Sequence, residues 1–268
     1  MAVAVAECGI FDGIFMDLWS ERAEAAPGPD GIAHLYHGNR VEALVSLVKR
    51  IREAVGDDFL IIVNTRTEKI PRSAPYVNGA FIETWDAAYP RERILEIEKA
   101  LSWYEANLRY PQVNCLDIAK SPSEPWDSPA NRQLVRAFTT LGLTHSNGYI
   151  LINGKPQDYG GHFWYPFFDA PLGRPIGAKG ETYKNRDGLF IREFTNGWAV
   201  YNRSGKVQVI ELPQEVSSWS SGVKDKRRHT LADLDGEIYL KAEAPPAADV
   251  NGDGVVNIQD LVIVANAF

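Results

Sequence analysis

The chain has 268 residues, a formal net charge of −7 and 45% hydrophobic residues. This length and apolar content allow a sizeable core, either in one large domain with an appendage or in two medium domains, and exclude wholesale disorder. The acidic balance argues against a nucleic-acid-binding protein, because phosphate contacts require clustered lysine and arginine. The one basic run is interpreted as a solvated loop and consists of Lys224, Lys226, Arg227 and Arg228. No segment is long and apolar enough to span a membrane.

An alternation of apolar runs and amphipathic helices extends over the first 150 residues. Apolar runs typical of strands lie at 11–18, 59–63, 79–82, 113–118 and 148–152, and helices are predicted at 40–55, 90–107 and 128–141. Continuous apolar strands that alternate with helices predict a parallel sheet covered on both faces. An open doubly wound sheet and a (β/α) barrel both fit this pattern. Because no glycine-rich phosphate loop follows any strand, and polar and aromatic residues stand at the strand ends, the barrel is favoured.

The number of repeating units sets the expected architecture. We count about five βα units, where a complete barrel has eight, and the first strand begins almost at once. The expected fold class is therefore α/β, with a partial (β/α)8 TIM barrel at 1–188 whose N-terminal strands are missing. A small antiparallel β domain is expected at 189–241, from alternating runs separated by Asn196-Gly197 and Ser204-Gly205, as in hairpins. The Ala/Pro-rich segment 242–248 is predicted to be a linker.

The C-terminal residues 249–268 carry the sharpest motif of the chain. Oxygen-bearing residues recur at the spacing of a calcium loop, with Gly254 at the position that needs a sharp turn. Calcium requires several oxygen ligands, and Asp260 would complete the set from the start of a C-terminal helix. The alternative is a solvated acidic turn. The predicted metal ligands are Asp249, Asn251, Asp253, Val255 (through its carbonyl), Asn257 and Asp260.

The run Asp-Val-Asn-Gly-Asp-Gly-Val-Val-Asn-Ile-Gln-Asp-Leu, which begins at Asp249, resembles a type I dockerin repeat. That family folds on calcium, and its paired repeats bind cohesin domains of scaffold proteins. The resemblance therefore implies calcium as a cofactor, a cohesin-type scaffold as a partner, and a location outside the cell or on its surface. The chain has one repeat where the family pairs two, so cohesin binding stays open.

Two acidic residues mark the predicted active site. Asp17 ends the apolar run Phe-Asp-Gly-Ile-Phe-Met-Asp, and Glu83 ends the run Gly-Ala-Phe-Ile-Glu. Both carboxylates are thus expected where parallel strands end, which is where barrel enzymes carry their sites. In glycoside cleavage one carboxylate attacks or stabilises an oxocarbenium-like centre while the other protonates the leaving oxygen. The alternative for both residues is a structural role, capping helices or holding loops.

Five further residues are predicted to bind substrate, each with an alternative. Aromatic rings stack on sugars, and polar groups bind hydroxyls. Trp164 belongs to an aromatic run that is otherwise typical of buried packing, Asn64 could instead stabilise a loop, and Asp117 could pair with Lys120. His34, His37 and His145 share no metal-ligand spacing and are interpreted as loop residues, and Cys115 is interpreted as a buried free thiol. The predicted substrate-binding set is Trp19, Asn64, Trp85, Asp117 and Trp164.

The same runs, together with Arg-Glu-Phe-Thr-Asn-Gly-Trp-Ala-Val-Tyr-Asn from Arg192, resemble glycoside hydrolases of the group that includes hypothetical glycosyl hydrolase family 15. The resemblance extends over most of residues 10–240. It implies a TIM barrel followed by a β domain and hydrolysis of an extracellular polysaccharide or oligosaccharide, with Asp17 as nucleophile or stabiliser and Glu83 as acid/base. The alternatives are a non-catalytic carbohydrate-binding or scaffold-attached module, or an inactive fragment of a larger enzyme.

Overall fold

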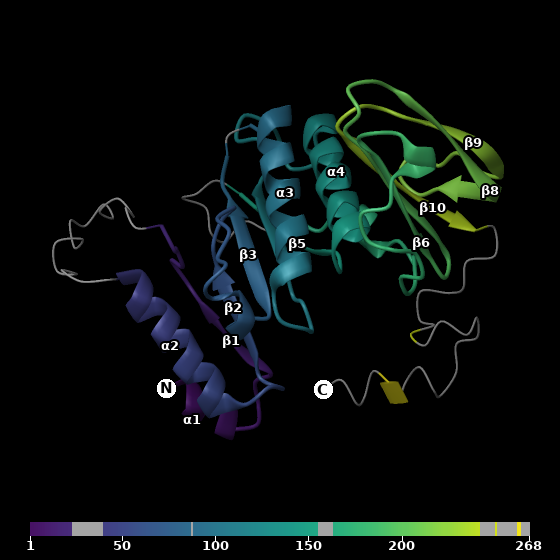
Figure 1. Ribbon diagram of the computed structural model, residues 1–268. Coiled ribbons are helices and arrows are strands. Elements are labelled where there is room, and N and C mark those ends of the chain that lie inside the picture. Colours follow the sequence, from purple (N-terminus) through teal and green to yellow (C-terminus); the bar gives the residue numbers. More distant parts are fainter. Residues whose placement is uncertain (23–39, 87, 155–162, 242–249, 251–261, 264–268) are drawn as a thin grey trace. The chain divides into compact units, whose positions relative to one another are not determined.

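The computed structural model describes residues 1–22, 40–86, 88–154, 163–241, 250 and 262–263. Its chain forms two compact units (Figure 1). Unit 1 comprises Met1–Trp85 and Glu92–Ile118, and unit 2 comprises Asp86–Arg91 and Ala119–Phe268. The predicted linker at 242–248 and nearly all of the predicted calcium loop and helix at 249–268 lie outside the described residues.

Unit 1 is built on parallel strands in chain order. Its elements are α1 (Ala2–Glu7), β1 (Gly13–Met16), α2 (Arg40–Val55), β2 (Leu60–Asn64), η2 (Ala74–Tyr76), β3 (Gly79–Thr84), α3 (Arg91–Asn107) and β4 (Cys115–Ala119). β1 pairs with β2, β2 with β3 and β3 with β4, each in parallel. The strand order of the whole parallel sheet is β1-β2-β3-β4-β5, with β5 at Tyr149–Asn153. The expected parallel α/β architecture is thus confirmed.

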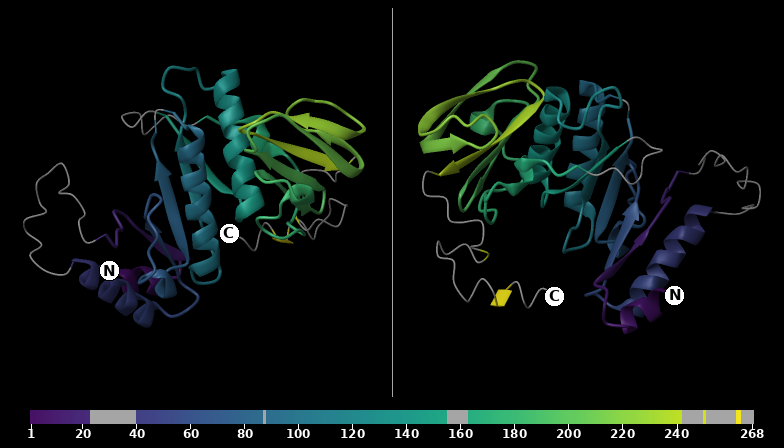
Figure 2. Two further views of the ribbon diagram at one scale, coloured as in Figure 1. Left: turned by 45° about the horizontal axis from the view of Figure 1, so that its top comes forward. Right: turned by 180° about the vertical axis from the view of Figure 1, so that it is seen from behind.

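The two faces of the unit 1 sheet differ in burial. Successive residues of a strand point to opposite faces, so every second residue belongs to the same face. On one face, Ile61, Val63, Ile82 and Leu116 are each at most 1% exposed. α2 and α3 run alongside the strands of this unit (Figures 1 and 2), and α3 is tied to the end of β2 by a 2.8 Å hydrogen bond between the Tyr104 and Thr65 hydroxyls.

Arg52, in the last turn of α2, joins the helix to the start of the sheet. Its guanidinium group is 6% exposed and donates to the carbonyls of Gly56 and Phe59 at 2.7 and 2.6 Å. It also donates to the Asn78 side chain at 2.6 Å, and that same Asn78 oxygen accepts from the Ile61 amide at 3.1 Å. A buried cation must have its donors satisfied, so this residue fixes the position of α2 against β2.

Replacing this cation tests its structural role. We expect Arg52→Ala to lower the free energy of unfolding by about 3 kcal/mol, because several buried acceptors lose their donor at once. Chemical denaturation followed by circular dichroism measures the change. The exposed neighbour Arg50→Ala is the matched control and should stay within about 0.5 kcal/mol of the parent. Equal effects of the two substitutions would contradict the anchoring role.

Unit 2 combines a helix with an antiparallel sheet. α4 (Pro129–His145) begins at Ser128, whose hydroxyl accepts from the Asn131 amide at 3.2 Å, an N-cap followed by proline at the first helical position. The sheet has the order β6-β7-β10-β8-β9, and α4 packs against β7 and β10 of this sheet (Figure 1). The remaining elements are η3 (Pro166–Asp169), η4 (Tyr183–Asn185), β6 (Leu189–Phe194), β7 (Gly197–Asn202), β8 (Gln208–Ser218), β9 (Lys226–Leu231) and β10 (Asp235–Lys241).

Two arginine side chains join α4 to this sheet through hydrogen bonds. Arg136 donates twice to Asp235 of β10, at 2.9 and 2.7 Å. Arg192 of β6 donates from one nitrogen to the carbonyls of Leu143 and Ser146, at 2.9 and 2.6 Å. The sheet has its own core, centred on Tyr183, Leu189, Trp198, Val200, Ile210, Leu212, Val216, Leu231 and Tyr239.

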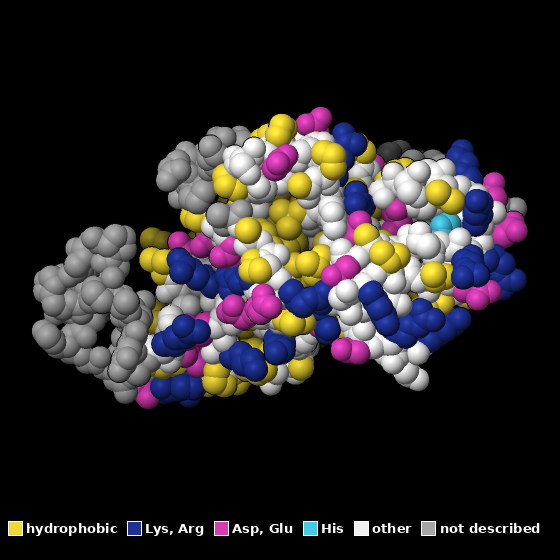
Figure 3. Space-filling view, turned by 90° about the horizontal axis from the view of Figure 1, so that it is seen from above, with side chains coloured by type: hydrophobic (Ala, Val, Ile, Leu, Met, Phe, Trp, Pro, Cys, Tyr) yellow, Lys and Arg dark blue, Asp and Glu magenta, His cyan; other side chains and the backbone are white. Residues whose placement is uncertain are grey.

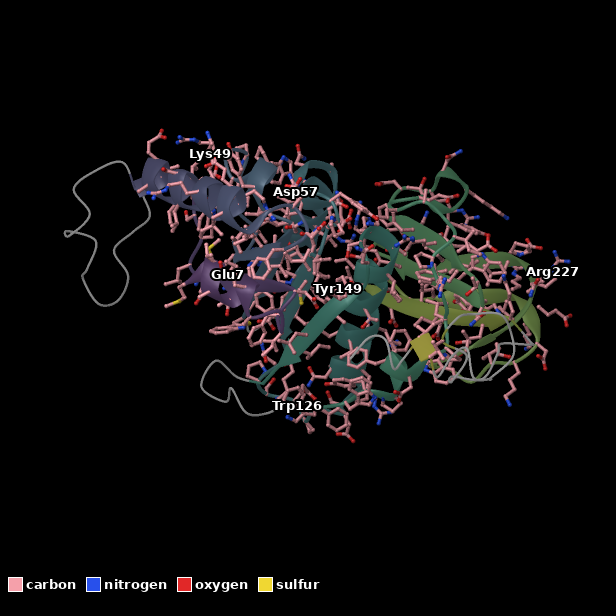
Figure 4. All side chains as sticks on the ribbon, turned by 90° about the horizontal axis from the view of Figure 1, so that it is seen from below. Glu7, Lys49, Asp57, Trp126, Tyr149 and Arg227 are labelled. Atoms are coloured by element: carbon pink, nitrogen blue, oxygen red, sulfur yellow. The ribbon has the colours of Figure 1, made fainter. Side chains whose placement is uncertain are left out.

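Two sequence interpretations are corrected in unit 2. The basic run lies largely in β9, an edge strand on which Arg227 and Arg228 are exposed while His229 and Leu231 point inward. Charged side chains on an edge strand discourage pairing with another chain, and this explains why the strand has the composition of a solvated loop. Figure 4 shows Arg227 at this periphery. His145 is a buried helical residue, not a loop residue, with its ring centroid 4.4 Å from that of Phe190.

Gly197 has a different role from the predicted turn. It is the first residue of β7 and pairs with Phe194, so the turn consists of Thr195 and Asn196. A Cβ on Gly197 would lie 2.0 Å from the Tyr239 carbonyl oxygen. Glycine is therefore required here because β10 approaches closely, not because of backbone conformation.

The described part of the chain has neither a membrane-spanning helix nor a cluster of metal-binding side chains. None of its helices combines the length and apolar character that crossing a bilayer demands. Nor do the described residues bring three or more His, Cys, Asp or Glu side chains together as a metal cluster. On the surface view in Figure 3, basic and acidic side chains are interspersed.

Candidate active site

The register of unit 1 places four polar side chains on one face of the sheet. Met16 pairs with Val63, so Asp17 follows β1 beside Asn64 at the end of β2. Asn64 pairs with Phe81 of β3, and Glu83, two residues later, lies on the same face. Glu83 in turn pairs with Asp117 of β4. The sheet thus brings together Asp17, Asn64, Glu83 and Asp117 from four different strand ends.

Asn64 connects the two predicted catalytic carboxylates. Its side-chain nitrogen donates to Asp17 Oδ1 at 2.8 Å and to Glu83 Oε2 at 3.0 Å. Because one nitrogen is within hydrogen-bond distance of both, the two facing oxygens lie no more than about 6 Å apart. Asn64 is only 6% exposed, whereas Asp17 is exposed and Glu83 half-buried. The carboxylates therefore remain reachable while the amide that holds them is part of the interior.

The backbone on either side of this group adopts an uncommon conformation. Leu18 and Arg66, which follow the ends of β1 and β2, have φ of 56° and 55°, in the left-handed region that costs a non-glycine residue about 1 kcal/mol or more. The turn at Leu18 lets its amide donate to Asp17 Oδ1 at 2.8 Å. The turn at Arg66 directs its amide to Asn64 Oδ1 at 3.3 Å. Both turns thus support the side chains that hold the site.

An apolar layer lies below the carboxylates on the same face. Phe15 and Phe81 meet edge to face with ring centroids 5.3 Å apart. Their positions precede Asp17 and Glu83 by two residues, so each ring lies one step further from the strand end than a carboxylate. Apolar surroundings strengthen electrostatic interactions between nearby charges. This pair was not singled out from the sequence, although the alternation Phe15–Asp17 and Phe81–Glu83 was a signal for it.

Asp117 forms the inner part of the site. It is 1% exposed, and its Oδ2 accepts from the indole nitrogen of Trp85 at 3.2 Å. Trp85 is half-buried and stands two residues after Glu83 in the sequence, and this bond fixes the orientation of its ring. The alternative partner considered for Asp117, Lys120, donates instead to the carbonyls of Ser121 and Glu124, at 3.0 and 2.8 Å.

The other two aromatic candidates, Trp19 and Trp164, differ in burial. Trp19 is only 4% exposed, and its indole nitrogen donates to the Ser73 hydroxyl at 3.0 Å. Stacking on a sugar requires a ring at the surface, so Trp19 does not meet that requirement. Its backbone amide donates to the Asn64 carbonyl at 2.8 Å, so Trp19 supports the end of β2. Trp164 belongs to unit 2, not to the unit that carries the carboxylates, and is 68% exposed.

Comparison with known proteins gives one family and one fold. The family model described as hypothetical glycosyl hydrolase family 15 matches residues 1–198, which is most of the chain. A solved structure, a GH27 β-L-arabinopyranosidase from Geobacillus stearothermophilus, is similar with a TM-score of 0.54 and 12% sequence identity. The similarity covers 90% of this chain and 60% of that one, so the chain spans less than two thirds of the length of the structure it matches. At this identity the likeness concerns the fold alone. No curated protein matches.

Cys115, on the same face as Asp117, offers a test of how closed this face is. Burial, assisted by the negative charge of Asp117, raises the pKa of its thiol from 9.0 to about 12. The reactive thiolate is therefore scarce below that pH, and we expect Cys115 to react with iodoacetamide roughly 10³-fold more slowly at pH 8 than an unperturbed thiol. The exposed free thiol of Cys8 is the internal reference. Peptide mass spectrometry measures both rates, and equal labelling would show that this face is open to water.

Proposed function

Because the chain belongs to hypothetical glycosyl hydrolase family 15, we propose that it is a glycoside hydrolase whose carboxylate pair is Asp17 and Glu83. The observation that carries this proposal is the single amide nitrogen of Asn64, which donates to both carboxylates. A pair of acids held at this spacing on one side of a partly apolar site is the arrangement that glycoside cleavage uses.

We propose a retaining mechanism, with which an upper limit of about 6 Å between one oxygen of each carboxylate is compatible. Retaining enzymes hold their carboxyl groups about 5–5.5 Å apart and inverting enzymes about 6.5–9.5 Å apart, and the facing oxygens here lie within about 6 Å. In the proposed first step Asp17 attacks the anomeric carbon while protonated Glu83 transfers its proton to the leaving glycosidic oxygen. In the second step the Glu83 carboxylate takes a proton from water, whose oxygen displaces Asp17 and releases the sugar.

Hydrogen bonding supports this division of roles. Asp17 Oδ1 accepts from the Leu18 amide and from Asn64, and two donors stabilise the negative charge that a nucleophile needs. Glu83 Oε2 accepts from Asn64 and is less exposed than Asp17, in keeping with a group that carries a proton to the substrate.

We assign substrate binding in this site to the half-buried Trp85, while Asn64 and Asp117, which are 6% and 1% exposed, hold the acids and the Trp85 ring in position. Trp85 is the ring that Asp117 holds in place, and Asp117 and Asn64 are polar groups on the same face as the acids. The substrate class is an oligosaccharide or polysaccharide, and action outside the cell or at its surface remains part of this proposal. Trp19 has a supporting role only, because its backbone amide donates to the Asn64 carbonyl.

We further propose that the C-terminal loop binds calcium. The support is the spacing of its oxygen-bearing residues from Asp249 to Asp260 and its resemblance to a dockerin repeat. A cohesin-type scaffold is the partner that the same resemblance suggests for this segment.

Removing either acid tests the proposed chemistry. We expect Asp17→Asn and Glu83→Gln each to lower hydrolysis by roughly 10²- to 10⁴-fold, because an amide neither attacks as a carboxylate nor transfers a proton. The measurement is proton NMR of a panel of aryl glycosides, with β-L-arabinopyranoside among them, which reports both the rate and the configuration of the first product.

The matched control for these variants is Asp12→Asn, which changes an exposed carboxylate that precedes β1. It should retain both the parent rate and the parent unfolding midpoint. Full activity in both acid variants would refute the site, and first release of the opposite anomer would refute the retaining mechanism while leaving the pair in place.

Calcium binding is tested separately by isothermal titration of the whole chain. We expect heat of binding with one site and a calcium-dependent rise in the unfolding temperature of the C-terminal segment, since an ion that binds only the folded loop stabilises it. Asp249→Ala should abolish both signals. A calorimetric trace without binding heat in the parent chain would remove calcium from the proposal.

A further inference from the structure

An aromatic cluster in unit 2 surrounds the short helix η3. A series of ring contacts connects Trp126 with Phe163 (centroids 6.3 Å apart, interplanar angle 14°), Phe163 with Tyr165 (4.8 Å) and Tyr165 with Phe168 (5.8 Å). Trp164 then meets Phe168 edge to face at 5.4 Å. Tyr165, at the centre, is 2% exposed, and its hydroxyl donates to the Trp126 carbonyl at 2.7 Å. The other four rings form a surface layer over Tyr165, which we call the aromatic platform: Trp126, Phe163, Trp164 and Phe168.

Two rings of this platform are exposed, and the other two, Trp126 and Phe168, are half-buried. Trp164 is 68% exposed and Phe163 38%. The indole nitrogen of Trp164 donates to Asp169 Oδ1 at 2.9 Å, which fixes the orientation of the ring while leaving its surface open. Trp126, at the surface in Figure 4, is held through its carbonyl by Tyr165. Exposure of tryptophan forgoes about 25 cal/mol for each Å² of apolar area left in water, so such a surface indicates a ligand.

The chemistry of the platform suits one class of occupant. A pyranose ring presents a flat face of C–H groups with hydroxyls around its edge. Aromatic side chains with few rotatable bonds offer rigid apolar area at low entropic cost. Polar groups accompany the rings: the Asp169 carboxylate accepts from the indole nitrogen of Trp164, and the Lys120 ammonium lies over the Trp126 ring, 5.5 Å from its centre. An apolar surface accompanied by charged hydrogen-bonding groups complements a sugar better than it complements a purely apolar partner.

We propose that the aromatic platform is a carbohydrate-binding site that holds pyranose rings of a polysaccharide independently of hydrolysis. Every residue of the platform belongs to unit 2, whereas the carboxylate pair belongs to unit 1. Binding here requires neither Asp17 nor Glu83, so the platform and the proposed hydrolase activity stand or fall separately.

The test is affinity electrophoresis of the whole chain in native gels that contain soluble xylan, barley β-glucan, galactomannan or arabinogalactan. Using the Asp17→Asn background prevents hydrolysis of the gel matrix. We expect retardation in at least one of these polysaccharides, and a weakening of about five- to tenfold for Trp164→Ala, since one aromatic contact contributes about 1–1.4 kcal/mol.

Three further variants separate stacking from general damage. Trp164→Phe keeps an aromatic face and should retain most of the binding. Asp169→Ala leaves the ring but releases its indole nitrogen, so binding should weaken less than with Trp164→Ala. Tyr110→Ala removes an aromatic that is 82% exposed in unit 1 and should leave retardation unchanged.

Two results would overturn the proposal. One is the absence of retardation in all four polysaccharides, or equal retardation of the parent and Trp164→Ala. The other is self-association in sedimentation experiments that Trp164→Ala abolishes while retardation persists, which would assign the surface to a second copy of the chain. Retardation without any hydrolysis by the chain with Asp17 intact would support the platform and count against the proposed enzyme.

Discussion

The parallel register of β1 to β4 is the constraint on which the candidate site depends. Because side chains alternate between faces with a period of two, a shift of one residue in any pairing would move an acid to the helix-covered side. Asp17, Asn64 and Glu83 meet only because Met16 aligns with Val63 and Asn64 with Phe81. The opposite face, at most 1% exposed at Ile61, Val63, Ile82 and Leu116, makes that register specific, since slippage would expose these apolar groups.

Support for the site comes from groups that do no chemistry themselves. Trp19 is buried against Ser73 and donates its backbone amide to the Asn64 carbonyl, while the Arg66 amide reaches the Asn64 side chain. Both contacts hold an amide that in turn holds two carboxylates. The backbone of Leu18 and of Arg66 is in the left-handed region, which costs a small amount of conformational free energy next to this group. Such strain is commonly found at functional sites.

The two compact units present different side chains. Unit 1 has its acids next to the Phe15–Phe81 pair. Unit 2 has exposed rings over the buried Tyr165 and an antiparallel sheet against which α4 packs. The family match covers residues 1–198, which include unit 1 and the part of unit 2 up to the first residues of β7.

The sequence by itself indicated the alternation of strands and helices in the first 150 residues, and that carboxylates end two of the strands. Apolar runs and helical spacing are local properties, so α2 was placed at its observed boundaries. It missed β9, because a charged edge strand and a solvated loop share one composition. Only the tertiary structure decided that Asn64 joins both acids, that Trp19 is buried and that Trp164 belongs to another unit than the acids. The physical reason is that the Asn64–Asp17 hydrogen bond joins residues 47 positions apart, and that the exposure of a ring depends on its neighbours in space. Both depend on sheet register and packing, which no local sequence pattern contains.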